Sequence, residues 1–151
     1  MTPPMTPLIE IRSLDTGDYD AICEVWKASG VSYRTTGRES RESFARQMQS
    51  GIQAVFGAVD AQANRLVGVV VASHDGRKGW INRLGVRPDC QRQGVGTRLI
   101  QAADDWLHGQ GMTITAALIV HGNDASLGLF QHSGYTLEHV YYLTKRDSPD
   151  A

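Results

Sequence analysis

The stretch VRPDCQRQGVGTRLI, residues 86–100, decides the fold of this 151-residue chain. The apolar run Trp80–Val86 that leads into it is typical of a β-strand, and apolar residues recur after it at helical spacing. At its centre stands Gln91-x-x-Gly94-x-Gly96, where two residues without a Cβ allow a sharp turn that exposes consecutive N–H groups. A glycine loop at the N-terminus of a helix favours anions, so this stretch predicts a site for a phosphate or pyrophosphate.

Composition limits the class of protein. Lys and Arg number 15 against 16 Asp and Glu, a net charge of -1, which gives no electrostatic footprint for nucleic acid or an anionic membrane. Small-molecule or protein partners are therefore expected. Cys23 and Cys90 form neither a CxxC motif nor a paired framework, which fits reduced thiols in a cytoplasm. The N-terminal MTPPMTP lacks a signal-peptide pattern and no stretch approaches about 20 apolar residues, so neither secretion nor membrane spanning is predicted.

The chain has the length of one domain, because 151 residues with 41% hydrophobic content can bury a core without disulfides or metals. We expect a disordered tail at 1–7, the domain at 8–147 and a short tail at 148–151. Alternation, helical periodicity and turn residues predict, in order, a strand at Ile9–Leu14, a helix at Asp18–Ala28, a shorter helix from Ser40 to near Gly51, a hairpin of Ala54–Asp60 and Leu66–Ser73, a strand at Trp80–Val86, a helix at Gly94–His108, a strand at Thr113–Val120, a helix at Asn123–Ser133 and a strand at Val140–Lys145.

The run Thr113–Val120 carries most information on topology. It is almost entirely apolar, which predicts a strand buried on both faces beside a parallel neighbour. Together with Trp80–Val86 and the helix between them, it forms a predicted βαβ unit. The last predicted strand lies in TLEHVYYLTK, residues 136–145, which fits either the core of the domain or the seam of a homodimer.

Two motifs at the proper separation resemble those of the GNAT superfamily of acyl-CoA-dependent N-acyltransferases. LGVRPDCQRQGVG, residues 84–96, is similar to the strand and loop motif of that family, and NDASLGLFQHSGY, residues 123–135, resembles its downstream helix motif. The loop is neither a dinucleotide fingerprint nor a P-loop, since the third glycine and the Gly-Lys-Ser/Thr ending are missing. DGRKGWINRLGV at residues 75–86 and the closing LTKR look most like small bacterial GNAT proteins without an assigned substrate.

The resemblance implies an α/β (α+β) fold in a single GNAT domain. The expected sheet is mixed, mostly antiparallel and six- to seven-stranded, flanked by four helices and splayed between the strands at Trp80–Val86 and Thr113–Val120. Acetyl-CoA would bind in that opening as cosubstrate. His74, His108, His132 and His139 share no metal-ligand spacing, so no metal is expected.

Carried over residue by residue, the resemblance assigns a cofactor role to residues of the strand end, the glycine loop and the downstream helix. The backbone of Leu84, Gly85 and Val86 would align the pantetheine arm, and Gln91 matches the first position of the loop motif. Asn123 would hydrogen-bond the pantetheine, although it is also a good helix N-cap, and Phe130 would flank the thioester sulfur. The residues expected to wrap the pyrophosphate are Arg92, Gln93, Gly94, Val95, Gly96 and Thr97.

In the family reaction an amine attacks the thioester carbonyl directly. The backbone N–H of Val86 is the expected oxyanion donor, an interaction worth about 3–4 kcal/mol. Many relatives carry a tyrosine acid seven residues after the asparagine, where this chain has Phe130. Phenylalanine donates no proton, but a thiol with a reference pKa of about 8.5 is a tolerable leaving group near neutral pH.

The general base is also absent from its usual places. Positions where some relatives have glutamate are Trp80 and Leu118 here. His121 is the first candidate to replace it because its reference pKa lies near 6.5, and an exposed loop histidine without a role is the competing interpretation. Tyr33 and Asn82 are the candidate acceptor-binding residues. Other candidates from the same cleft are Glu138 and Tyr141.

The predicted function is N-acetylation of a primary amine in a small molecule or peptide. A non-catalytic acyl-CoA-binding or sensing module is the alternative from another class, and a toxin that acts on charged tRNA is disfavoured by the net charge. Without a strong base, an amine of low pKa is the expected acceptor, since only about one lysine amine in 2,500 is neutral at pH 7. The arginine-rich residues 34–46 favour either an acidic acceptor or simply a solvated helix face.

Overall fold

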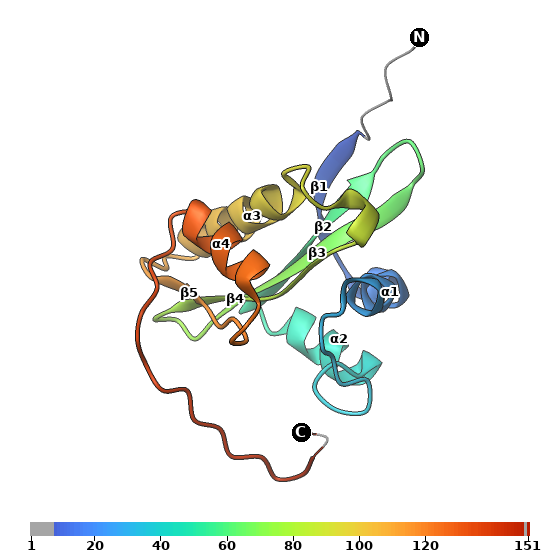
Figure 1. The fold of residues 1–151 in the computed structure, drawn as a ribbon. Helices are drawn as coiled ribbons and strands as arrows, with labels where there is room; N and C mark the ends of the chain where they lie inside the picture. Colours follow the sequence, from blue (N-terminus) through green and yellow to red (C-terminus); the bar gives the residue numbers. More distant parts are fainter. Residues whose placement is uncertain (1–7, 150) are drawn as a thin grey trace.

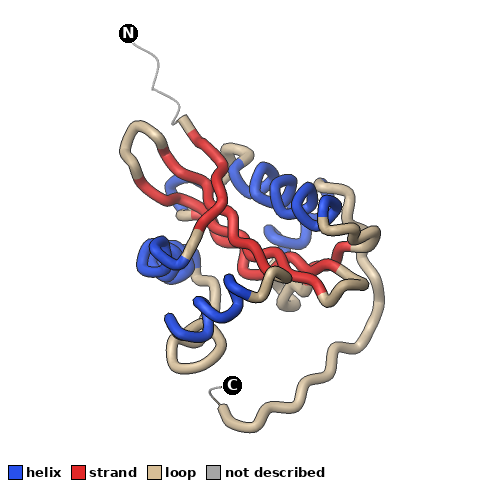
Figure 2. Tube along the Cα trace, turned by 180° about the vertical axis from the view of Figure 1, so that it is seen from behind, coloured by secondary structure: helices blue, strands red, loops and turns tan. Residues whose placement is uncertain are grey.

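A five-stranded mixed sheet separates two pairs of helices (Figures 1 and 2). The computed structural model describes residues 8–149 and 151, so the predicted tail at 1–7 lies outside the described residues. The elements are β1 (Ile9–Leu14), a 3-10 turn at Thr16–Asp18, α1 (Tyr19–Ser29), α2 (Arg41–Gln49), β2 (Gln53–Asp60), β3 (Arg65–His74), β4 (Gly79–Val86), a 3-10 turn at Pro88–Cys90, α3 (Val95–Gly109), β5 (Thr115–Ala117) and α4 (Asp124–His132).

The strands follow one another across the sheet in chain order, β1-β2-β3-β4-β5. The first four pair antiparallel, and β5 pairs parallel to β4 after the crossover through α3. This βαβ unit is the one that the sequence predicts. The parallel ladder is short, because Gly79–Ile81 pair with Thr115–Ala117 while β4 continues to Val86 without β5 beside it.

The core lies on both faces of the sheet. Period-two alternation in β3 sends Val69 and Val71 to the face covered by α1, and Val70 and Ala72 to the face covered by α3. Trp26 of α1, only 1% exposed, anchors the first face. The fully buried side chains of α3 are Leu99, Ile100, Ala103 and Leu107. Helices therefore cover both faces of the middle strands. The C-terminal end of β4 and the N-terminus of α3 project from this core and lie next to each other in the chain.

The six- to seven-stranded sheet predicted from the sequence is wrong for the described residues, which form five strands. Val140–Lys145 makes no ladder and runs away from the body as an extended segment (Figure 1). The expected burial of Thr113–Val120 on both faces is also wrong, since Leu118 is 47% and Val120 80% exposed. The physical reason is the same in both cases: β5 is the last strand of the sheet, and no neighbour covers its outer edge.

The helix boundaries follow the capping residues. Ser40 accepts a hydrogen bond from the N–H of Ser43 at 3.2 Å, and Asn123 accepts one from the N–H of Ser126 at 3.2 Å. α1 ends at Gly30, which adopts the left-handed conformation at φ 76°. None of the described helices has both the length and the apolar character needed to cross a membrane.

Candidate functional site

A bulge in β4 opens the sheet at its centre. Val69 pairs with Gly85 and Val71 with Asn82, so β4 holds one residue more than β3 over this interval. Arg83 lies in the bulge with φ 52°, in the left-handed region. Beyond the bulge β4 has no partner on its β5 side. The edge of the strand from the bulge to Val86 therefore faces open space.

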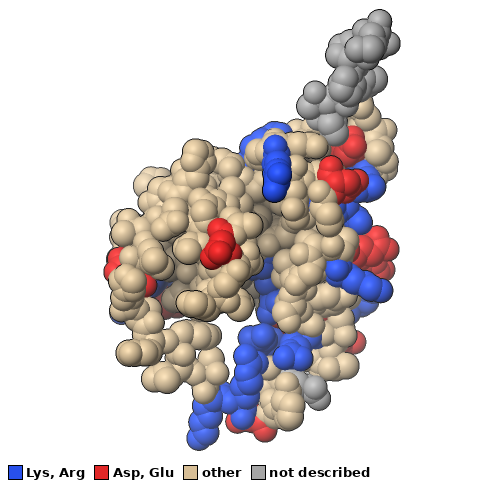
Figure 3. All heavy atoms as spheres, viewed as in Figure 1, with Lys and Arg blue, Asp and Glu red and all other residues tan. Residues whose placement is uncertain are grey.

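That space is a cavity of about 1320 Å³ between β4, the N-terminus of α3, α4 and the connection from α1 to α2. It is visible as the hollow in Figure 3, with Lys and Arg atoms (blue) on its floor and below it. We call the part lined by residues 84–86, Gln91, Arg92, residues 94–97, Asn123 and Phe130 the glycine-loop half. The part lined by Trp26, residues 29–32, Arg38, Glu39 and Arg83 is the Glu39 half.

Val86 has both of its backbone polar groups off the ladder with β3. The N–H of Arg87 donates to the carbonyl of Val67 at 2.8 Å, so the N–H one residue earlier points to the opposite, cavity-facing edge. The carbonyl of Val86 accepts from Nε2 of Gln91 at 3.0 Å. The side chain of Gln91 thus fixes the loop to the strand end and leaves the N–H of Val86 as a donor toward the cavity.

The glycine loop forms a concave array of N–H groups. Arg92 at φ 63° and Gly94 at φ 78° are both left-handed, a backbone arrangement that turns successive N–H groups inward. Gly94 is the N-cap of α3 and supplies no side-chain cap, so the first turn of the helix keeps its N–H groups free. The helix dipole adds to their attraction for an anion. The order of strand, glycine loop and helix that the sequence predicts is therefore present, and binding of an anion by the loop stays a prediction.

Close packing at two glycines keeps the walls of the cavity together. A Cβ on Gly85 would collide with the side chain of Ser29 and lie 3.0 Å from Cγ2 of Val31. A Cβ on Gly96 would lie 2.7 Å from Cδ2 of Leu129. Gly85 therefore allows the end of α1 to approach β4, and Gly96 allows α4 to approach α3.

Most of the residues assigned from the sequence come together around this cavity. Those that line it are Leu84, Gly85, Val86, Gln91, Arg92, Gly94, Val95, Gly96, Thr97, Asn123, Phe130 and Asn82. Val95 is 2% exposed, so only its backbone is available to a ligand. Gln93, Tyr33 and His121 are not among the lining residues.

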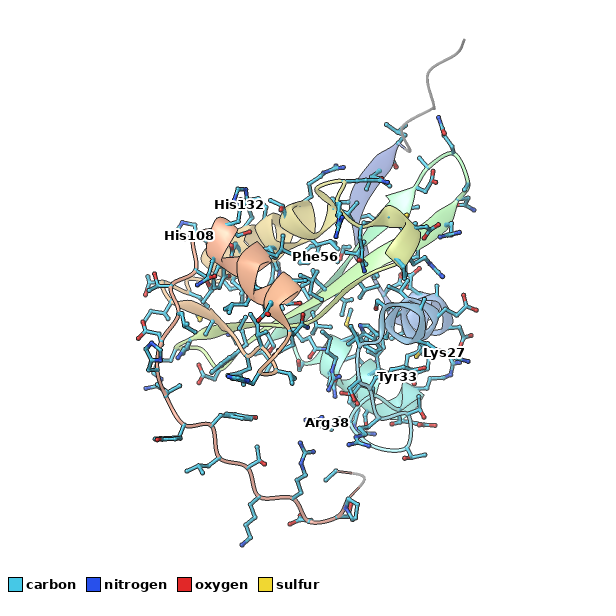
Figure 4. All side chains as sticks on the ribbon, viewed as in Figure 1. Lys27, Tyr33, Arg38, Phe56, His108 and His132 are labelled. Atoms are coloured by element: carbon cyan, nitrogen blue, oxygen red, sulfur yellow. The ribbon has the colours of Figure 1, made fainter. Side chains whose placement is uncertain are left out.

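Tyr33 packs instead on Trp26, with ring centroids 5.6 Å apart, and belongs to the core on the α1 face. Figure 4 shows Tyr33 and Arg38 on the α1–α2 side of the molecule and His132 at the far end of α4. His121 is an exposed loop residue just after the β5 region. Arg98, a second arginine near the loop, donates to the carbonyl of Ile9 at 2.8 Å and so faces β1.

Phe130 occupies the place of the expected acid and is 5% exposed. Its ring meets that of Tyr135 edge to face at 5.1 Å. The hydroxyl of Tyr135 cannot substitute for the missing acid, because it donates to Asp104 at 2.5 Å and lies 3.0 Å from Oγ1 of Thr115. Neither Tyr135 nor Asp104 lines the cavity.

Sequence reasoning missed Glu39 and Arg83. Glu39, 6% exposed, is the one carboxylate among the residues that line the cavity within the described part of the chain. It pairs with the guanidinium of Arg83 and accepts from the N–H of Arg34 at 2.6 Å. Burial lowers the pKa of Arg83, and the neighbouring carboxylate counteracts this. The sequence shows Glu39 only as one acid in an arginine-rich run, which gives no signal of burial.

The Glu39 half also holds Arg38, whose Nε lies 3.8 Å from Glu39 and whose side chain is 54% exposed. Arg83 donates to the carbonyl of Ser32 as well, so this residue ties the α1–α2 connection to the bulge. Two cations therefore share one carboxylate here.

Over residues 8–149, no group of three or more His, Cys, Asp or Glu is placed to hold a metal ion. Burial raises the pKa of the Cys90 thiol, which keeps it protonated.

Similar solved structures share this fold. AAC(6')-Iy in complex with the bisubstrate analogue CoA-S-monomethyl-acetylneamine superposes with a TM-score of 0.76 at 19% identity, over 92% of this chain and 99% of that chain. The PaiA N-acetyltransferase of Thermoplasma acidophilum in complex with coenzyme A gives a TM-score of 0.75 at 19% identity, over 89% and 93%. At such identities the likeness establishes the fold alone.

Sequence comparison gives a relative and a family. Acetyltransferase YE1169 of Yersinia enterocolitica serotype O:8 is 30% identical over 81 residues, which are 54% of this chain and 57% of that protein. The match thus spans little more than half of that relative. The profile of the acetyltransferase (GNAT) family matches residues 19–135, more than three quarters of the chain and all of the cavity described above. The chain belongs to the acetyltransferase (GNAT) family.

Proposed function

We propose that the protein transfers the acetyl group of acetyl-CoA to the primary amine of a small molecule or peptide by direct attack. One observation carries the proposal: the unpaired end of β4, the glycine loop and the free N-terminus of α3 open into the same cavity. A strand edge can align an extended amide-containing arm, and the helix N-terminus can hold its phosphates.

The residues of the glycine-loop half fit acetyl-CoA. The backbone of residues 84–86 would hold the pantetheine arm, and the N–H groups of residues 92–97 would hold the pyrophosphate. Asn123 uses Oδ1 as a helix cap, which leaves its amide N–H groups for the arm. Acetyl-CoA supplies the thioester that the amine attacks, and the free N–H of Val86 would stabilise the negative charge that develops on its carbonyl oxygen.

The Glu39 half would receive the acceptor. Its carboxylate pairs with the guanidinium of Arg83 and accepts from the N–H of Arg34, so we assign it a positioning role and not that of a general base. An acceptor amine that is partly neutral at pH 7 needs no such base, which favours an α-amine over a lysine side chain. This half is lined by two arginines, Arg38 and Arg83, and by one carboxylate, that of Glu39. The excess of positive charge disfavours a polycationic acceptor such as an aminoglycoside, although the similar structure AAC(6')-Iy is named as an aminoglycoside N-acetyltransferase.

A CoA-release assay against a library of amines tests the proposal. The library holds free amino acids, peptide N-termini, lysine-only peptides and aminoglycosides, each measured at several pH values. We expect release with α-amines, rising with pH as the amine loses its proton. A marked preference for unperturbed lysine or for aminoglycosides would contradict the proposed acceptor.

A non-catalytic acyl-CoA-binding module is the second candidate, and the buried Phe130 favours it because no tyrosine of the described residues lines the cavity to replace the acid. Shifts in thermal unfolding with CoA and acetyl-CoA report binding independently of turnover. Stabilisation by acetyl-CoA without CoA release for any amine would support this module and refute the transferase.

A further inference from the structure

The arginines of residues 34–46 differ in where their side chains lie. The guanidinium of Arg41 pairs with Asp20 at 2.6 Å, and that of Arg46 forms a hydrogen bond within α2. Neither lines the cavity, whereas Arg38 does. An acidic acceptor and a solvated helix face are the two explanations that the sequence leaves open for this run. Arg41 and Arg46 fit the solvated face, and Arg38 is the residue that could meet an acidic acceptor.

The guanidinium of Arg38 has unused donors. Its side chain is 54% exposed, and Nε lies 3.8 Å from Oε1 of Glu39, which is beyond hydrogen-bond distance. In the described part of the chain, no residue accepts a hydrogen bond from this guanidinium. Arginine carries five N–H donors in a planar fork that matches the two oxygens of a carboxylate. The fork of Arg38 is therefore open to a ligand in the cavity.

The carboxylate of Glu39 is already occupied by other groups. It pairs with the guanidinium of Arg83 through Oε1 and accepts from the N–H of Arg34 through Oε2 at 2.6 Å. Arg83 also donates to the carbonyl of Ser32. One negative charge therefore balances Arg83 and leaves the positive charge of Arg38 in excess. Excess positive charge on the wall of a cavity attracts a ligand of opposite sign.

The backbone of Arg38 is held in place from the sheet. Nε2 of Gln47 in α2 donates to the carbonyl of Arg38 at 2.8 Å, and Nε2 of Gln53 in β2 donates to Oε1 of Gln47 at 3.3 Å. Both glutamines line the cavity. Because this chain of hydrogen bonds fixes the base of the side chain, less conformational freedom is lost when the guanidinium contacts a ligand.

We propose that the acceptor carries a carboxylate in addition to its α-amine, and that Arg38 binds this carboxylate. The inference rests on the proposed acetyl transfer and names the class of its acceptor: a free amino acid, or a peptide whose first residue is acidic. Both present a carboxylate a few bonds away from the amine. The contact with Arg38 would hold the acceptor in the Glu39 half, with its amine toward the thioester beside Val86.

Pairs of acceptors that differ in one charge test the proposal in the CoA-release assay. One pair is glutamyl-alaninamide and glutaminyl-alaninamide. The other is alanine and alaninamide, compared at equal concentrations of neutral amine. We expect the carboxylate-bearing member of at least one pair to have a kcat/KM about tenfold higher, and that pair identifies which carboxylate is bound. Equal values within both pairs, or higher values for the neutral members, overturn the proposal.

Arg38→Gln shows whether the preference comes from this side chain. It should raise the KM of the preferred acceptor about tenfold and leave that of its neutral counterpart within about twofold. Arg38→Lys keeps the charge without the fork and should restore part of the preference. Arg46→Gln removes an arginine that does not line the cavity and should keep the full preference. A preference that survives Arg38→Gln, or that Arg46→Gln also removes, contradicts the proposal.

A binding measurement separates this inference from the proposed reaction. CoA has no acetyl group to transfer, so its complex with the protein can bind an acceptor without turnover. The thermal midpoint of this complex should rise more with the carboxylate-bearing member of one pair than with its neutral counterpart, and Arg38→Gln should remove the difference.

That difference without CoA release for any amine would refute the acetyl transfer and support the carboxylate site. Equal thermal shifts within both pairs would overturn the carboxylate site. If Arg38→Gln loses cooperative unfolding, the paired acceptors measured on the unsubstituted chain decide alone.

Discussion

The two halves of the cavity are built in different ways. In the glycine-loop half the cavity-facing groups that we assign to cofactor binding are mostly backbone, and they come from nearby residues of β4, the loop and the first turn of α3. In the Glu39 half they are charged side chains from segments far apart in the chain. Nε1 of Trp26 donates to the carbonyl of Arg83 at 3.1 Å, across 57 residues of sequence.

This difference predicts which kind of substitution should affect each half of the cavity. The glycine-loop half depends on close packing, because an added side-chain atom would displace the backbone that carries the N–H groups. The Glu39 half depends on ion pairing, because a buried charge without its partner raises the free energy of the folded state. Steric substitutions should therefore affect cofactor binding, and charge substitutions should affect the acceptor.

Gly85→Val tests the first half and should have the largest effect. The added side chain collides with Ser29 and Val31, so the strand edge must move away from α1. A displacement near 1 Å can cost about a hundredfold in a positioned site, and overpacking costs roughly 1–3 kcal/mol of stability. We expect CoA affinity, measured by calorimetry, to fall by about that factor. Gly109→Ala, with nothing within 4 Å of the new Cβ, is the matched control and should bind CoA normally.

The same difference explains which half of the cavity could be predicted from the sequence. Gln91, Gly94 and Asn123 lie in short motifs whose chemistry depends on local spacing, and the structure places all three at the cavity. The strand, loop and helix around them follow from periodicity and glycine chemistry. This part of the site is therefore predictable from the sequence alone.

The rest depends on contacts between distant segments. Glu39 is buried because the α1–α2 connection folds onto the bulge of β4, where Arg83 pairs with it. No local pattern encodes that approach. The error at Thr113–Val120 has a related cause: an apolar run predicts burial, but whether another strand lies along its outer edge depends on distant parts of the chain.

Glu39→Gln tests the second half. Glutamine keeps the shape and can still accept from the N–H of Arg34, but it removes the charge that pairs with Arg83. Loss of such a charged hydrogen bond costs roughly 1–3 kcal/mol, and we expect the acceptor KM to rise roughly tenfold with CoA affinity within twofold. Glu42→Gln, an exposed glutamate of α2, should change neither. Parallel losses of CoA and acceptor binding would show that the halves are not separate.

Phe130→Tyr probes the boundary between the halves. Phe130 lines the cavity and packs against Tyr135, so a hydroxyl at the ring tip would return a proton donor to the position where relatives have tyrosine. We expect kcat for CoA release to rise about fivefold, short of the roughly hundredfold that a fully positioned acid supplies. Phe56→Tyr adds the same atom in β2, away from the cavity lining, and should leave kcat unchanged. An unchanged kcat in Phe130→Tyr would mean that thiolate protonation does not limit turnover.

Asp104 lies outside both halves of the cavity. Asp104→Asn should therefore change only the free energy of unfolding, by less than about 1 kcal/mol. Burial raises the pKa of the Asp104 carboxyl above its ordinary value of 3.8, and hydrogen bonds from Tyr135 and Thr115 only partly oppose this. The folded state therefore holds this proton more tightly than the unfolded state does. Its contribution to stability is complete below pH 3.8 and is lost as the pH rises through the folded pKa.

Asparagine keeps an oxygen that accepts from the hydroxyl of Tyr135 and removes the charge that burial disfavours. Chemical denaturation at a series of pH values should show a variant more stable than the parent at pH 7, with the two converging in acid. Asp105→Asn removes one charge at the exposed neighbouring position and should not reproduce this pH dependence. A variant that is less stable at pH 7 would mean that the ionised carboxylate stabilises the network with Tyr135, despite the upward direction of its pKa.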